Sequence, residues 1–135
     1  MLQGIRVVEL GVWVAGPAAA GILADWGADV IKVEPPAGDP MRAIFQTTIA
    51  SEVPHNPPFE LDNRGKRSVV LDLGSEAGRR AMEALLAGAD VLVTNMRPAA
   101  LERLGLEFRL RGMEVSSSKG LRREDDIVII AARAK

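Results

Sequence analysis

The sequence predicts an α/β fold built on an open, doubly wound parallel sheet. Residues 16–34 read as one helix followed directly by a buried strand, and residues 5–10 supply a strand ahead of them. A second strand–helix–strand series spans residues 66–94. Both helices end in the same way, with Gly-Ala-Asp-Val at residues 27–30 and again at residues 88–91. Two such units with short connections favour parallel strands covered by helices.

In the first unit, the strand at residues 5–10 leads through a glycine-containing loop to a helix. Pro17 suits the first helical position, where its missing N–H removes no helical hydrogen bond. Helical spacing places four apolar residues on one face, namely Ala19, Ile22, Leu23 and Trp26. Gly27 suits a left-handed helix cap. The next strand, residues 30–33, ends at Glu34.

Residues 35–64 separate the two units and are rich in Pro, Asn and Asp. We expect an irregular segment there, with a partial helical turn near residues 41–46. A connection of this length inside a compact domain is typical of a functional or disordered loop.

The second unit begins with a predicted strand at residues 66–73. Ser75 is a good helix N-cap, and Glu76 suits the positive end of the helix dipole. The apolar face of this helix consists of Ala81, Met82, Leu85 and Leu86. Gly88 ends the helix, and residues 90–94 form a strand.

Composition narrows the class of protein. The chain has 135 residues, 47% of them hydrophobic, which is enough for one core. Its formal net charge of −1 speaks against electrostatic binding to nucleic acid or to a membrane surface. It has no cysteine, no signal-peptide pattern and no apolar run long enough to span a membrane. We therefore expect a cytoplasmic protein without a metal site.

Ligands of open parallel sheets bind at the carboxyl ends of the strands, so the loops at residues 11–17, 71–75 and 94–98 are the candidate site. The first leads onto a helix N-terminus, which suits an anionic or carbonyl group. Its Gly-x-x-x-x-Gly spacing lacks the Lys of a phosphate-binding loop. A Gly-x-Gly-x-x-Gly fingerprint is also missing, so Glu34 alone supports a nicotinamide dinucleotide.

Two further groups of residues have competing interpretations. The cations Arg64, Lys66 and Arg67 either meet phosphates or form a solvated cluster at the start of a strand. Asn and Arg in the loop at residues 94–98 favour a ligand role, because such groups are costly to leave unsatisfied at the end of a buried strand.

Several segments together resemble the N-terminal part of the family III CoA-transferases, a group that includes the α-methylacyl-CoA racemases. The resemblance covers most of residues 4–106, in the family's order and spacing. The matching segments are residues 4–10, 15–17, 23–34, Gly38 and Asp39 with Arg42, 63–68, 71–73, 89–95 and 101–105.

The resemblance implies a coenzyme A site on a Rossmann-like domain. The positions that it assigns to CoA are Val14, Ala15, Leu71, Asp72, Leu73, Gly74, Asn95, Met96 and Arg103. Asn95 and Met96 match a loop on the pantetheine side, and Arg103 matches a residue that meets a CoA phosphate. The chain departs from the family at Pro35, often an Arg near the adenine, and at Gly74, where the family has Lys.

The resemblance also implies a reaction. CoA would pass between an acyl-CoA and a carboxylic acid, after a carboxylate attacks the thioester carbonyl. The family continues beyond residue 106 with an aspartate nucleophile, which is not recognisable here, so the catalytic residue is unknown. We expect residues 1–106 to be an incomplete large domain and residues 107–135 to be a divergent tail, with linker-like residues 116–118 and 122–126 and a strand at 126–131.

Alternatives remain at this point. The chain could be an acyl-CoA racemase relative, with His55 as a base, although a surface histidine is the simpler interpretation. It could also be an inactive truncated remnant or an NAD-binding domain. Asp125 and Asp126 could act as carboxylate catalysts, but a capping or solvated role is the simpler one. Family members form interlocked homodimers, but the segments that interlock are not recognisable here, so a homodimer is expected of full-length relatives and the sequence predicts no oligomeric state for this chain.

Overall fold

The computed structural model describes residues 1–48, 55–106, 113–117 and 129–133. Its strands form one sheet in the order β3-β2-β1-β4-β6-β5. Their bounds are β1 Arg6–Leu10, β2 Asp29–Glu34, β3 Arg67–Val70, β4 Val91–Thr94, β5 Met113–Ser117 and β6 Ile129–Arg133. The first four strands are parallel, β6 runs antiparallel to β4, and β5 runs antiparallel to β6. The predicted α/β class and parallel sheet are confirmed for β1 to β4.

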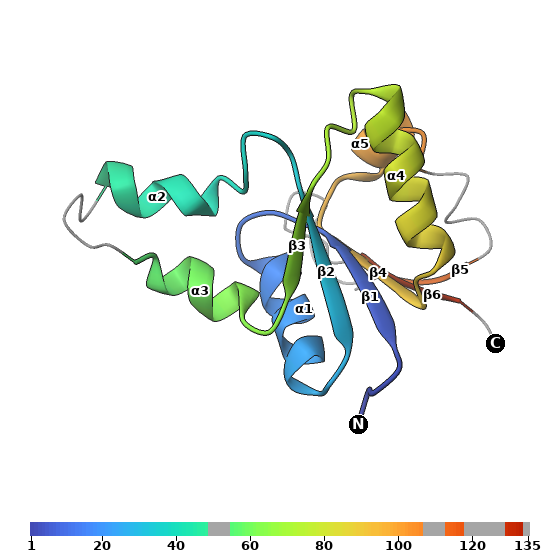
Figure 1. The fold of residues 1–135 in the computed structure, drawn as a ribbon, viewed down its shortest axis with the longest axis horizontal. Helices are drawn as coiled ribbons and strands as arrows, with labels where there is room; N and C mark the ends of the chain where they lie inside the picture. Colours follow the sequence, from blue (N-terminus) through green and yellow to red (C-terminus); the bar gives the residue numbers. More distant parts are fainter. Residues whose placement is uncertain (49–54, 107–112, 118–128, 134–135) are drawn as a thin grey trace.

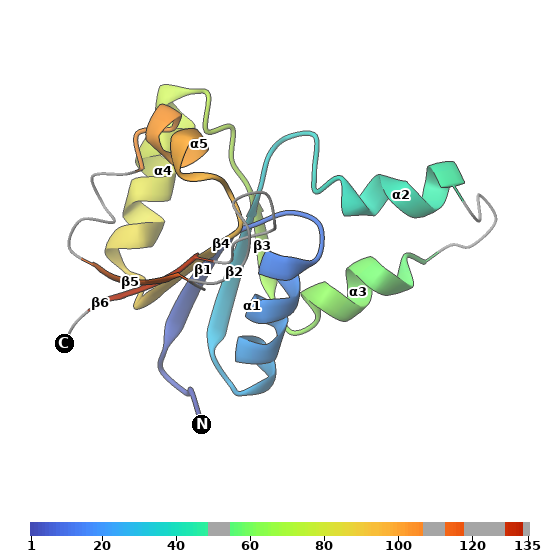
Figure 2. The ribbon, with the colours of Figure 1, turned by 180° about the vertical axis from the view of Figure 1, so that it is seen from behind.

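Helices lie on both faces of the sheet (Figures 1 and 2). Their bounds are α1 Ala15–Asp25, α2 Met41–Thr48, α3 Pro57–Asn63, α4 Glu76–Ala87 and α5 Pro98–Arg103. Helix α1 covers one face with α3 packed beside it, and α4 and α5 cover the other. The segment that carries α2 and α3 projects sideways from the sheet (Figure 1).

The alternation of side chains along β1 divides the interior into two parts. Val8 and Leu10 face α4 and α5, in a cluster with Met82, Leu92 and Leu101. Val7 faces α1, in a smaller cluster with Ala20, Val30 and Val93. Glu9 shares the α1 side of β1 with Val7, because residues two apart on a strand point to the same face. A carboxylate is therefore built into the smaller core.

The predicted apolar face of α1 is wrong in part. Ile22 and Trp26 are 45% and 49% exposed, whereas Gly16, Ala20 and Gly21 are buried. A Cβ atom added at Gly21 would lie 2.9 Å from the carbonyl oxygen of Asp62 in α3. The small residues therefore form the packing face, because they let α1 approach α3 and the sheet closely. Gly27 does adopt the expected left-handed conformation, with φ of +95°.

Three other expectations are corrected. Residues 35–64 carry the helices α2 and α3, not one partial turn, and Asn56 caps α3 by accepting the Phe59 N–H at 3.0 Å. Strand β3 ends at Val70, three residues earlier than expected. Ser116 and Ser117 belong to β5 instead of a linker. Residues 118, 122–126 and the start of the expected strand at 126–131 lie outside the described residues.

None of the helices that the structure describes has the length and apolar character needed to cross a lipid bilayer.

Candidate functional site

The carboxyl ends of β1 to β4 meet at one edge of the sheet, where the chain leaves each strand in a loop. From β1 the chain first adds strands on one side, β2 and then β3, and afterwards crosses to the other side to form β4. This reversal of direction makes the edge beside β1 a topological switch point. Ligands of open α/β sheets bind in the crevice that such a reversal opens. The geometry of the loops at this edge therefore decides what can bind.

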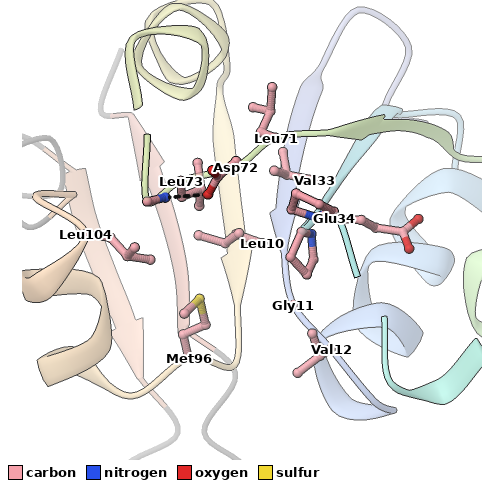
Figure 3. A pocket seen from close by; sticks show the side chains of 13 residues that line it. Leu10, Gly11, Val12, Val33, Glu34, Leu71, Asp72, Leu73, Met96 and Leu104 are labelled. Atoms are coloured by element: carbon pink, nitrogen blue, oxygen red, sulfur yellow. Dashed lines mark hydrogen bonds between the residues drawn. The ribbon is translucent and has the colours of Figure 1, made fainter. Parts of the chain in front are cut away.

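A cavity of about 280 Å³ lies at this edge (Figure 3). It receives residues from the ends of all four parallel strands and from α5. The lining residues are Leu10, Gly11, Val12, Val33, Glu34, Pro35, Pro36, Leu71, Asp72, Leu73, Gly74, Met96 and Leu104. The lining is mostly aliphatic, and a mostly apolar concave site with a few polar groups is typical of small-molecule binding.

The loop between β3 and α4 forms one wall of the cavity. Asp72 Oδ1 accepts the Gly74 N–H at 2.9 Å, and the Ser75 hydroxyl donates to the Asp72 carbonyl oxygen at 2.8 Å. Ser75 also caps α4 as expected, because its Oγ accepts the Gly78 N–H at 3.0 Å. Arg79 Nη1 donates to the Gly74 carbonyl oxygen at 2.8 Å. This wall is thus a hydrogen-bonded turn with a guanidinium beside it.

The loop between β1 and α1 forms the opposite wall. Asn95, which follows β4, binds both backbone groups of Val12: its Oδ1 accepts the N–H at 3.1 Å, and its Nδ2 donates to the carbonyl oxygen at 2.8 Å. Asp39 Oδ1 accepts the Trp13 N–H at 3.2 Å. Side chains from two other loops therefore fix the path of this one.

A buried network of charges lies behind this wall, on the α1 side of the sheet. Lys32 Nζ lies 2.8 Å from Glu9 Oε1 and 2.9 Å from Asp39 Oδ2. Lys66 Nζ lies 2.6 Å from Glu9 Oε2 and also donates to the Pro17 carbonyl oxygen at 2.8 Å. Burial lowers the pKa of Lys66 from its usual value, an effect that the neighbouring Glu9 carboxylate opposes. Among the described residues, every buried side-chain polar atom has a partner.

Glu34 belongs to this polar side, although its backbone borders the cavity. Its carboxylate points away from the cavity (Figure 3) and binds the Arg42 guanidinium through two contacts of 2.8 Å. The Ser68 hydroxyl donates to Oε1 at 2.8 Å, and the Asp39 N–H donates to Oε2 at 3.1 Å. The bond from Arg42 above all lowers the pKa of Glu34 to about 2. The one residue that supported a dinucleotide site is thus fully engaged elsewhere.

The sequence of this chain matches a known protein family. Residues 2–111 match CoA-transferase family III. The chain belongs to CoA-transferase family III. It is 40% identical over 111 residues to the (R)-2-hydroxy-4-methylpentanoate CoA-transferase of Clostridioides difficile. The match covers 80% of this chain and 27% of that protein. It is 42% identical over 111 residues to the cinnamoyl-CoA:phenyllactate CoA-transferase of Clostridium sporogenes, again over 80% of this chain and 26% of that one.

Two solved structures with about 40% sequence identity share the fold of the matched part of the chain. A CAIB/BAIF family protein from Brucella suis superimposes with a TM-score of 0.68 and 40% identity, over 77% of this chain and 28% of its own. The hypothetical protein Rv3272 from Mycobacterium tuberculosis superimposes with a TM-score of 0.66 and 42% identity, over 78% of this chain and 28% of its own. The chain spans about a quarter of the length of the curated relatives that it matches.

Five of the nine positions that the family resemblance assigned to CoA line the cavity. They are Leu71, Asp72, Leu73, Gly74 and Met96. The other four are not among the lining residues. Val14 is the N-cap of α1 and Ala15 is its first residue, Asn95 holds the opposite wall, and the exposed Arg103 donates to the Ala99 carbonyl oxygen at 3.1 Å. Their contacts with CoA stay predictions.

The sequence analysis missed the contribution of the loop after β2. Val33, Pro35 and Pro36 line the cavity together with Leu10 at the end of β1 and Leu104 after α5. A signal was present, because residues at the carboxyl end of a buried parallel strand belong to the same edge as the other loops. The paired prolines directly after Glu34 marked where that strand ends.

The three cations considered for phosphate binding have partners within the chain. Arg64 binds the Asp25 carboxylate, Arg67 binds Asp29 at 2.7 Å, and Lys66 is buried in the charge network. His55 is exposed and lies 3.3 Å from Glu60 Oε1. Asp125 and Asp126 lie outside the described residues, and within the described part no group of His, Asp and Glu side chains could hold a metal ion.

Proposed function

We propose that this chain is the CoA-binding part of a CoA-transferase, which moves coenzyme A between an acyl-CoA and a carboxylic acid. One observation supports the proposal above the others. In a chain of this family, a cavity at the switch point of the sheet is lined by five of the positions expected to contact CoA. The specific acyl group stays open, because the relatives' names cover several different acids.

The cavity offers an apolar surface, and exposed cations near it offer partners for the phosphates of CoA. Its aliphatic lining favours the apolar surface of the ligand, and the hydrogen-bonded turn at Asp72 and Gly74 gives one wall a fixed shape. Two exposed cations could pair with phosphates. Arg79 contacts the Gly74 carbonyl, and Arg103 directly precedes the lining residue Leu104.

The chemical step requires a free carboxylate beside the thioester. A carboxylate oxygen attacks the thioester carbonyl, the C–S bond breaks, and CoA leaves as a thiolate while a mixed anhydride forms. The carboxylates that line the cavity are poorly suited to this role. Glu34 is held by Arg42 with a pKa of about 2, and Asp72 accepts a backbone N–H. We propose that the nucleophile comes from outside the described residues.

An acyl-CoA racemase is a weaker alternative. It needs an acid/base pair beside the substrate, and His55 does not line the cavity. The cytoplasmic location expected from the composition also belongs to this proposal.

Calorimetric titration of the purified chain with CoA, and separately with NAD, tests the proposal. We expect saturable binding of CoA and no saturable binding of NAD. An Arg79→Gln variant should bind CoA at least about tenfold more weakly, since a hydrogen bond to a charged group contributes about 1.5–3 kcal/mol net. Arg67→Gln, an exposed cation at the other end of β3, is the matched control. Failure of the wild-type chain to bind CoA would overturn the proposal.

A further inference from the structure

The loop of residues 11–14 adopts a backbone conformation that its sequence disfavours. Trp13 has a φ of +65° and is the only residue, apart from glycines, with a positive φ in the described part of the chain. Such a conformation costs on the order of 1 kcal/mol or more for a side chain other than glycine. The indole is 43% exposed, so its own packing does not compensate for the cost. Other contacts must therefore hold the loop.

Side chains from two different loops bind consecutive backbone groups of this segment. The Asn95 amide closes a two-bond ring with Val12, at 3.1 and 2.8 Å. Asp39 Oδ1 accepts the next N–H, that of Trp13, at 3.2 Å. The two anchors thus hold the residue before the strained one and the N–H of Trp13 itself.

Asp39 is itself immobilised. It is 2% exposed, its Oδ2 binds Lys32 Nζ at 2.9 Å, and its Oδ1 also accepts the Met41 N–H at 2.9 Å. Lys32 extends the same anchor, because its Nζ donates to the Gly11 carbonyl oxygen at 3.2 Å. The anchor therefore rests on the buried charge network and not on a mobile surface side chain.

Two glycines leave the space that the Asn95 side chain occupies. A Cβ atom added at Gly11 would lie 3.2 Å from Asn95 Oδ1, and one added at Gly16 would lie 3.3 Å from it. Both distances are tighter than nearly all real Cβ contacts. The two glycines of the Gly-x-x-x-x-Gly spacing thus make room for an amide from another loop, and this explains the spacing without a phosphate.

We propose that Asp39 and Asn95 are positioning residues that together hold residues 11–14 in the conformation that completes the CoA cavity. Gly11 and Val12 line the cavity directly, so movement of the loop changes the cavity wall. This inference rests on the proposed function for the identity of the ligand. It goes beyond that function by assigning a role to a residue, Asp39, that does not line the cavity.

The test uses the full 135-residue chain in a Trp26→Phe background, which leaves Trp13 as the fluorescent reporter on the loop. Asp39→Asn weakens the acceptor and removes the charge that faces Lys32, while the side chain keeps its size. Asp90→Asn is the matched control, because Asp90 Oδ2 accepts the Arg6 N–H at 2.9 Å before β4, at the opposite edge of the sheet. Circular dichroism checks that each variant is folded.

We expect Asp39→Asn to raise the Kd for CoA about tenfold, because the weakened anchor lowers the fraction of chains whose loop is in the binding conformation. It should also increase acrylamide quenching of Trp13, whereas Asp90→Asn should change neither quantity. If Asp39→Asn does not fold, Asn95→Ala takes its place in the test, because it removes no charge. It should have the same two effects. Because both residues hold one loop, the double variant should weaken binding less than the product of the single effects.

The proposal is overturned if the folded variants bind CoA as the wild type does, or if Trp13 quenching is unchanged in both. A wild-type chain that binds no CoA would overturn the proposed function instead. In that case Trp13 quenching alone decides whether Asp39 and Asn95 position the loop.

Discussion

Glu9 and Lys32 are directly opposed in the register of β1 and β2, and Lys32 Nζ lies 2.8 Å from Glu9 Oε1. Both side chains are almost completely buried. The pair belongs to the network with Asp39 and Lys66, which links the middle of the sheet to the loops at the edge that carries the cavity. A buried pair is not by itself stabilising relative to apolar residues, but removal of one partner leaves an uncompensated charge.

Lys32→Met should therefore lower the free energy of unfolding by about 3–5 kcal/mol, because Glu9 and Asp39 would each lose a buried cation. Urea unfolding followed by circular dichroism measures the change. The matched control is Arg67→Met in β3, whose ion pair with Asp29 is exposed and should be worth less than about 1 kcal/mol. Similar losses in the two variants would contradict the role of burial.

Gly78→Ala should disrupt the turn that forms one wall of the cavity. A Cβ atom at Gly78 would lie 2.0 Å from the Asp72 carbonyl oxygen, so either α4 or the loop must move. We expect a loss of stability of about 2 kcal/mol or more and weaker CoA binding. Gly88→Ala is the control, because its nearest neighbour at 3.0 Å is the end of the flexible Arg6 side chain. Calorimetric titration and urea unfolding report the two effects; a stable Gly78→Ala chain with unchanged binding would contradict the prediction.

Leu73→Trp should block the cavity without unfolding the protein. Leu73 lines the cavity from a half-buried loop position, so a larger side chain occupies the ligand's space at little cost to the core. We expect the affinity for CoA to fall at least about tenfold, equivalent to about 1.4 kcal/mol. Leu61→Trp, on the exposed surface of α3, should leave the affinity unchanged. Equal CoA affinity in both variants would place the ligand elsewhere.

Acid should destabilise the chain through Glu34. Its pKa is lowered from 4.5 to about 2 in the folded protein, so its contribution is fully present above pH 4.5 and is lost as the pH falls towards 2. The shift corresponds to roughly 3 kcal/mol at neutral pH. Urea unfolding between neutral pH and pH 3 should therefore show a shallower decline for Glu34→Gln, which starts from a lower stability. Parallel curves for the two proteins would refute the assignment.

The strands and the cap residues of this fold are local, and they could be predicted. Strand β2, from its β-branched run, and the Ser75 cap of α4 were both predicted from neighbouring residues. Helix α3 was missed although its signal is local too, with Asn56 as N-cap directly before two prolines. The packing face of α1 could not be found from periodicity, because close approach to α3 at Gly21 decides it.

The sequence by itself determined the α/β class, the parallel order of units and the edge of the sheet at which the cavity lies, because hydrophobic periodicity and helix caps act over a few residues. Family resemblance then identified the ligand expected there. Only the tertiary structure decided which cations are free to meet a ligand, that Glu34 is bound by Arg42, and that Asp39 and Asn95 hold the loop after β1. Asn95 and Val12 are separated by 83 residues, and such contacts depend on how strands pair, which no local pattern encodes.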